Sequence, residues 1–179
     1  MTAQDFSTRL VVDRTPEQVF EAICNVRGWW SENIDGPTHE LGAMFDYRYR
    51  DVHHCKLKIV ELLAPHKVVW QVLNNYFSFT RDKTEWTGTI VRFDIGRRDG
   101  QTEVRFTHVG LTPLYECYGI CCDGWSTYIN GSLHDLITTG KGRPNVGEAI
   151  TASEQALSPI GHAVDPIEGR LSEVQARIS

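Results

Sequence analysis

The feature that most constrains the fold of this chain is a single long helical pattern that follows a series of two-residue alternations. Spacing of three and four residues is typical of one face of an amphipathic helix, and Pro113 and Gly140 stand where such a helix would begin and end. Three internal glycines, at positions 119, 124 and 131, weaken this helix. Its predicted apolar face consists of Leu114, Tyr118, Cys121, Trp125, Ile129, Ser132 and Leu136.

Alternation of apolar and polar residues before that helix predicts half-buried strands. Phe45, Tyr47 and Tyr49, for example, alternate with charged residues, so their rings are expected to face inward. Short links between the strands favour an antiparallel, meandering sheet and an α+β fold class. Residues 74–83 are expected to form a longer connection. The expected strands, about six, cover residues 6–12, 45–49, 55–63, 68–72, 85–95 and 102–109.

Two short helices are expected between the first and second strands. Thr15 and Gln18 have the spacing of a capping box, and Pro16 suits the first helical turn. A second helical turn is expected over residues 26–31, which include Trp29 and Trp30.

Composition excludes several classes of partner and location. The net charge of −5 arises from 18 basic and 23 acidic residues without a basic stripe, so no nucleic-acid partner is expected. No apolar run reaches the roughly 18 residues that span a bilayer, so no membrane span is expected. The first residues lack a secretory signal pattern, which predicts a cytoplasmic protein whose five cysteines are reduced thiols.

A change of composition after Pro144 divides the chain into a domain at 1–144 and a tail at 145–179. The tail is expected to form a linker and a short amphipathic helix with Ile167, Leu171, Val174 and Ile178 on one face. Docking on this chain, docking on a neighbouring copy in a homodimer, and disorder at the end are the alternatives.

Four segments carry a resemblance to a known family: RGWWS at 27–31, EWTGT at 85–89, FTHVGL at 106–111 and CDGW at 122–125. Over about residues 5–142 the chain resembles the SRPBCC (START-like) superfamily, in the branch of homologues of the heat-shock chaperone ATPase activator. The resemblance implies the helix-grip fold, in which a curved antiparallel sheet wraps around a long C-terminal helix. Members of the superfamily include lipid carriers, polyketide cyclases, oxygenase domains and chaperone cofactors, so the fold does not settle the function.

Between the sheet and the long helix we expect a mostly apolar cavity, the usual character of a site for a small molecule. The alternative is that the same rings simply fill the core. The direction in which Trp86 points is left open by the pattern. The predicted ligand-binding residues are Trp29, Trp30, Phe45, Tyr47, Trp70, Phe79, Trp86, Phe106, His108, Tyr118, Cys121, Cys122, Trp125 and Tyr128.

His108 is a weak candidate for general acid–base catalysis because it shares the inward strand face with Phe106, but a lone inward histidine is more often a core residue. Neither Cys117 with Cys121 nor the His53-His54-Cys55 run has the spacing of a four-ligand zinc site, so no metal is expected. No nucleophile elbow or phosphate-binding loop is present, and no cofactor is expected.

Three functions remain open on this basis. The first is non-catalytic binding of a hydrophobic small molecule in the cavity. The second is a cyclase- or dehydratase-like reaction with His108 as the acid or base. The third is an interaction with a chaperone ATPase, as the activator resemblance implies.

Overall fold

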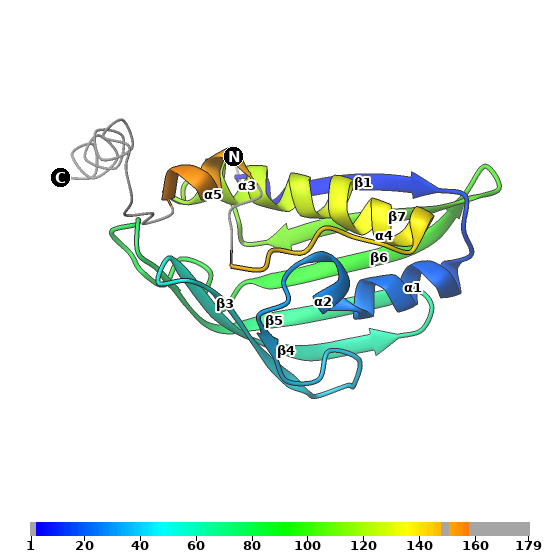
Figure 1. Cartoon of the computed structure of the whole chain (residues 1–179), viewed down its shortest axis with the longest axis horizontal. Helices are drawn as coiled ribbons and strands as arrows, with labels where there is room; N and C mark the ends of the chain where they lie inside the picture. The colour runs from blue at the N-terminus through cyan, green and yellow to red at the C-terminus, as the bar shows by residue number, and fades with distance from the viewer. Residues whose placement is uncertain (1–2, 148–150, 158–179) are drawn as a thin grey trace.

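A single antiparallel sheet, in the order β1-β7-β6-β5-β4-β3-β2, forms the body of the protein (Figure 1). The computed structural model describes residues 3–147 and 151–157. Within these residues the sheet has seven strands. The one strand that the alternation does not predict is the two-residue β2, which pairs with β3. The strands are β1 (Phe6–Val12), β2 (Ile34–Asp35), β3 (Met44–Tyr49), β4 (His53–Leu63), β5 (Lys67–Phe77), β6 (Ile90–Arg98) and β7 (Gln101–Val109).

The helices gather on one face of this sheet (Figure 1). The first helix, α1, packs against β5 and β6, and the long C-terminal helix packs against β1 and α2. The predicted helix-grip fold is therefore confirmed. In the described part of the chain no helix is both long and apolar enough to cross a membrane. The helical elements are α1 (Pro16–Cys24), α2 (Val26–Trp29), α3 (Tyr118–Thr127), η1 (Tyr128–Leu133), α4 (His134–Thr139) and α5 (Ala152–Leu157).

The capping box predicted at the start of α1 is present. The backbone N–H of Gln18 donates to the Thr15 hydroxyl at 3.2 Å, and the backbone N–H of Thr15 donates to the Gln18 side chain at 3.0 Å. Pro16 occupies the first turn, where its missing N–H costs no helical hydrogen bond. The helix then buries Val19 and Ile23 completely against the sheet.

Strand alternation correctly predicts the inward residues of β3, where Phe45, Tyr47 and Tyr49 are all buried. It fails at the end of β4. Leu63, predicted to face inward, is 56% exposed. The pairing of β4 with β5 shifts register between Ile59 and Glu61, and a one-residue bulge moves the following side chains to the opposite face.

The expected connection over residues 74–83 and the expected strand start at 85 are both wrong. The strand β5 continues to Phe77, which pairs with His53 of β4, while its pairing with β6 covers only Lys67 to Gln71. The chain between β5 and β6 is a looped segment in which Gly88 has a φ of 85°, a backbone conformation that favours glycine. Residues 85–89 therefore form a loop beside the helix, and β6 begins at Ile90.

The predicted long helix is present but begins later and contains a π-helical turn. Leu114 precedes it and is 85% exposed, so its predicted place on the buried face is wrong. The π-turn η1 widens the helix by one residue, which brings both Ser132 and Leu133 to the buried side. Beyond the turn Ile137 is buried and the predicted Leu136 is only partly buried.

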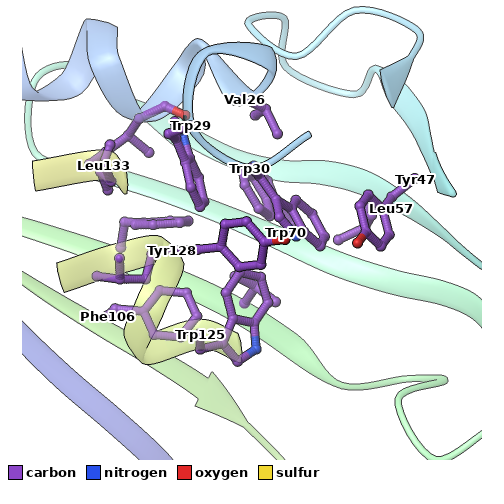
Figure 2. Close-up of a cluster of buried hydrophobic side chains, with 14 of the residues drawn as sticks. Val26, Trp29, Trp30, Tyr47, Leu57, Trp70, Phe106, Trp125, Tyr128 and Leu133 are labelled. Atoms are coloured by element: carbon purple, nitrogen blue, oxygen red, sulfur yellow. Dashed lines mark hydrogen bonds between the residues drawn. The ribbon is translucent and has the colours of Figure 1, made fainter. Parts of the chain in front are cut away.

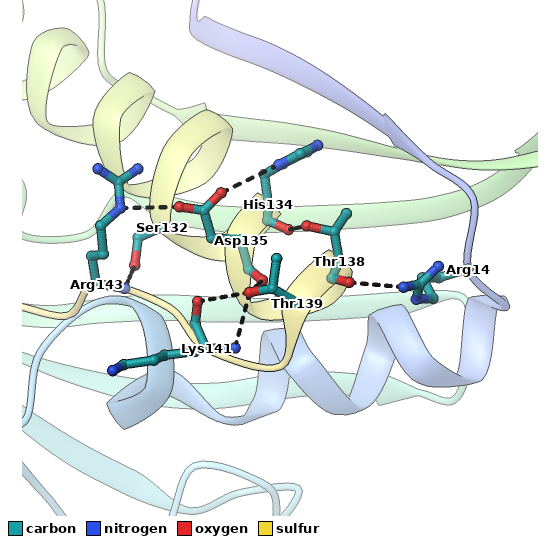
Figure 3. Close-up of polar contacts among 8 residues, drawn as sticks. All are labelled: Arg14, Ser132, His134, Asp135, Thr138, Thr139, Lys141 and Arg143. Atoms are coloured by element: carbon teal, nitrogen blue, oxygen red, sulfur yellow. Dashed lines mark hydrogen bonds and ion pairs between the residues drawn. The ribbon is translucent and has the colours of Figure 1, made fainter.

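The C-terminal end of the helix is fixed by polar contacts (Figure 3). Gly140 ends it in the left-handed conformation, as predicted. Arg14 donates to the Thr138 carbonyl at 2.7 Å, and Arg143 pairs with Asp135 at 3.0 Å. The following segment reaches the end of α2, where the backbone N–H of Asn145 donates to the Trp30 carbonyl at 3.0 Å.

The described part of the predicted tail packs on the domain. Asn145 is fully buried and forms an isolated parallel bridge with Ser31, and α5 contacts α3. The predicted helix with Ile167, Leu171, Val174 and Ile178 lies outside the described residues. The division at residue 144 therefore stays a prediction.

Candidate functional site: an aromatic cavity between helix and sheet

A small, partly open cavity lies between α3, α5 and the β3–β5 side of the sheet. Its volume is about 60 Å³, and its surface is mostly apolar. Seven of the predicted ligand-binding residues line it: Trp30, Tyr47, Phe79, Trp86, Cys121, Trp125 and Tyr128. The other lining residues were not among the predicted ligand-binding residues: Tyr49, Val52, His53, Phe77, Ile120, Gly124, Glu154 and Leu157.

The remaining predicted residues do not line the cavity. Trp29, Trp70 and Phe106 are fully buried in the packed centre of the helix–sheet interface (Figure 2). Phe45 is also fully buried and packs edge to face on Trp70. Trp70, for example, stacks on Trp30 at 6.1 Å between ring centroids. Phe106 packs against Trp125 at 4.8 Å. His108 is also buried, whereas Tyr118 and Cys122 lie on the partly exposed side of α3.

Both ring nitrogens of His108 are occupied. The indole N–H of Trp125 donates to His108 Nδ1 at 3.0 Å, so the proton of the neutral ring lies on Nε2. Nε2 is 2.8 Å from the hydroxyl of Thr89, which in turn donates to the Trp86 carbonyl at 2.6 Å. Burial lowers the pKa of His108 to about 3. This residue links helix, strand and loop, and it has no free nitrogen for proton transfer.

The loop after β5 places Trp86 beside the helix. Asn75 Oδ1 accepts hydrogen bonds at 3.0 Å from the backbone N–H of Trp86 and from the Thr87 hydroxyl. The buried carboxylate of Glu85 accepts from the backbone N–H groups of Glu116 and Cys117, at 2.8 and 2.9 Å, just before α3 begins. A carboxylate is favourable there because unpaired N–H groups and the helix dipole make a helix start electropositive.

Two ring nitrogens on residues that line the cavity lack the hydrogen-bond partners that both nitrogens of His108 have. They are His53 Nε2 and Trp86 Nε1, which are buried and unpaired within the described residues. The two rings meet edge to face at 4.7 Å, and Trp86 also stacks on Trp125 at 5.6 Å. Burial, followed by the charges of His54 and His108, lowers the pKa of His53 to about 3, so its ring is neutral at pH 7.

A buried polar network closes the side of the cavity next to α5. Asn145 Nδ2 donates to the hydroxyls of Tyr128 and Tyr47 at 3.0 and 3.3 Å. Tyr128 donates to Glu154 at 2.7 Å, and Glu154 forms a reciprocal capping box with Thr151. Burial raises the pKa of both tyrosines well above the ordinary value, which keeps them protonated. The Thr151-x-x-Glu154 spacing was the sequence signal for α5.

Metal ligation has no support in the described part of the chain, where no three His, Cys, Asp or Glu side chains converge. The Cys117 thiol hydrogen-bonds to Cys121, and this contact together with burial raises the pKa of Cys117 far above the usual range. These thiols are inert packing groups in this arrangement.

Comparison with known proteins places this geometry in a structural group. The Aha1 dimer of Colwellia psychrerythraea is similar with a TM-score of 0.64 and 25% identity, over 78% of this chain and 99% of that one. The resemblance to the Aha1-like branch of the SRPBCC superfamily is confirmed. No protein-family model and no curated protein sequence matches the chain.

Two further solved structures show the same fold at lower identity. SSP2350 of Staphylococcus saprophyticus has a TM-score of 0.59 and 18% identity, over 81% of this chain and all of that one. CalU16 of Micromonospora echinospora has a TM-score of 0.56 and 11% identity, over 98% of this chain and 88% of that one. The shared SRPBCC fold here contains a small, partly open aromatic cavity between helix and sheet.

Proposed function

We propose that this SRPBCC protein binds a small hydrophobic molecule, without catalysis, in the cavity between α3 and the sheet. The observation that carries the proposal is the hollow itself. The rings around Trp70 and Phe106 are fully buried, whereas the rings at this end of the interface stand apart and enclose a cavity with a volume of about 60 Å³. A concave, largely apolar lining with few polar groups is the usual character of such a site.

The volume sets the size of the ligand. Sites for drug-sized molecules measure about 300–1,000 Å³, and this cavity is several times smaller. The ligand we propose is therefore about the size of one aromatic ring, and its entry displaces α5. That helix has only six residues, and it contributes Glu154 and Leu157 to the cavity wall.

Two glycines of α3 supply a matched test. Gly124 lines the cavity and Gly119 does not, and at both positions an added Cβ has open space within 4 Å. Replacing either glycine with leucine also favours the helix. We expect Gly124→Leu to weaken binding of ethylbenzene at least tenfold, by calorimetric titration, and Gly119→Leu to leave it unchanged. If ethylbenzene fails to bind the wild-type protein, or if it binds both variants equally, the proposal is wrong.

A catalytic role for His108 is not favoured by this geometry. The ring lies outside the cavity wall, and both nitrogens already have partners. A general base needs a free nitrogen within reach of the substrate proton.

Similarity to a dimeric Aha1 supports a second proposal, that this chain forms a homodimer. Light scattering of the purified protein tests it, and a monomer at all concentrations up to about 100 μM would refute it. An interaction with a chaperone ATPase and a cytoplasmic location stay predictions, the first to be tested by pull-down with the cognate chaperone.

A further inference from the structure

The unpaired indole N–H of Trp86 is the least expected polar group on the rings that line the cavity. The side chain is only 4% exposed, and its nitrogen has no partner within residues 3–147 and 151–157. Buried polar groups in folded proteins are nearly always hydrogen-bonded, so each exception calls for a physical reason. The hydroxyls of Tyr47 and Tyr128 in the same wall are, by contrast, both paired.

The surroundings of Trp86 prevent the ring from turning outward to find water. Its backbone N–H and carbonyl are held by Asn75 and Thr89. Its ring lies nearly parallel to Trp125, at an angle of 10°, and meets the rings of Phe77 and His53 edge to face. The protein therefore holds an unpaired indole N–H donor in a fixed place on a ring that lines an apolar cavity.

The charges around the cavity exclude an anionic partner for this donor. Among the described lining residues Glu154 carries the formal charge at neutral pH, and it is negative. His53 is neutral there because burial suppresses its protonation. A carboxylate ligand would have to shed its hydration beside Glu154 without meeting a cation, which is strongly unfavourable in an apolar site.

We propose that the ligand is a neutral, planar, ring-sized molecule with one acceptor oxygen, such as an aryl ketone, which accepts a hydrogen bond from Trp86 Nε1. His53 Nε2, the second unpaired nitrogen, lies on the adjacent ring, and the neutral tautomer that carries its proton on Nε2 donates to the same oxygen. This inference rests on the proposed function, because it specifies the ligand of that same cavity.

Three probes of similar size separate the requirements of the site: acetophenone, which has a neutral acceptor; ethylbenzene, which has none; and benzoate, which is anionic. We expect acetophenone to bind about tenfold more tightly than ethylbenzene, the usual gain from one hydrogen bond to an unpaired donor. Benzoate is expected not to bind at concentrations that saturate the protein with acetophenone. In ¹H–¹⁵N spectra the Trp86 indole N–H should move downfield with acetophenone alone.

Trp70 provides the matched control. Its indole nitrogen is also buried and unpaired in the described residues, but the ring does not line the cavity. Trp86→Phe removes the donor and should abolish the preference for acetophenone over ethylbenzene, whereas Trp70→Phe should retain it. Each variant is judged by the ratio of its affinities for acetophenone and ethylbenzene. A general loss of stability weakens both affinities and therefore does not change this ratio.

The outcomes distinguish the two proposals. If ethylbenzene does not bind the wild-type protein, the proposed function is wrong, and this inference, which rests on it, is wrong as well. If ethylbenzene and acetophenone bind equally, or if Trp86→Phe keeps the preference, the cavity still binds hydrophobic molecules but the donor has no role. Tighter binding of benzoate than of acetophenone would overturn the requirement for a neutral ligand.

Discussion

The two ends of the helix–sheet interface use the same kind of residue in different ways. Around Trp70 and Phe106, the aromatic rings are fully buried and pack against one another through Phe93. Around Trp86, equally large rings enclose a cavity and leave two nitrogens without partners in the described residues. The packed end holds both kinds of polar group: His108 has both nitrogens paired, whereas Trp70 Nε1 has no partner within the described residues. Neither aromatic content nor an unpaired donor alone therefore marks a ligand site, and incomplete packing beside such a donor is the feature that separates the cavity end.

Truncating one ring at each end gives the largest test of this difference. Phe106 contacts Phe6, Phe93 and Trp125, so Phe106→Ala should lower the free energy of unfolding by about 3–5 kcal/mol. Phe79 lies beside an existing hollow and has Phe77 as its ring neighbour, so Phe79→Ala should cost only about 2 kcal/mol. Urea unfolding of both variants measures the two losses. Equal losses would show that the cavity end is packed as tightly as the centre.

Acidification tests the paired end of the interface. His108 is neutral in the folded protein with a pKa near 3, whereas in the unfolded chain it takes up a proton below about pH 6.5. The unfolded state therefore binds more protons in this range, and stability must fall as the pH drops from 6.5 towards 3. Between pH 6.5 and 5 the contribution of His108 is about 2 kcal/mol.

Urea unfolding at these two pH values checks the loss. His108→Gln should start less stable, because it breaks the contacts with Trp125 and Thr89, but its stability should fall less with acidification. His39→Gln, at a side chain that is 70% exposed, is the control for the loss of a histidine, and the slope of His108→Gln is compared with it. An unchanged slope in His108→Gln would mean that this ring is not held neutral by burial.

The sequence predicts the packed end of the interface better than the cavity end. At the packed end, period-two alternation correctly places Phe45 inside because the pleat of a regular strand repeats every two residues. The same rule fails at Leu63, where a bulge changes the register, and no local pattern announces that bulge. The π-turn likewise changes which helical residues are buried, and a spacing of 3.6 residues cannot predict it.

The cavity end depends on contacts between residues that are far apart in the sequence, and composition does not predict such contacts. Asn145 and Glu154 belong to a segment interpreted as tail, yet they bond to Tyr128 at 3.0 and 2.7 Å. The sequence pattern indicates His53 only as part of a candidate metal-binding run, although its ring contacts Trp86 in the structure. The capping-box spacing from Thr151 to Glu154 was visible in the sequence and predicts a helix start, but not the surface that the helix covers.

The smallest expected effect concerns the contact between the cavity and α5. Tyr128→Phe keeps the ring but removes the hydroxyl that joins Asn145 to Glu154, which should lower the free energy of unfolding by about 1 kcal/mol. The loss should be local. Amide hydrogen exchange in Ala152–Leu157 should become faster than in the wild type, while exchange in β7 should follow only the change in global stability.

Tyr76→Phe is the control, because Tyr76 is 41% exposed and its replacement should change neither the free energy of unfolding nor the exchange rate in α5. Unaltered exchange in α5 would show that Leu157 alone holds the helix, and entry to the cavity would then depend on apolar packing and not on the hydrogen bond to Glu154.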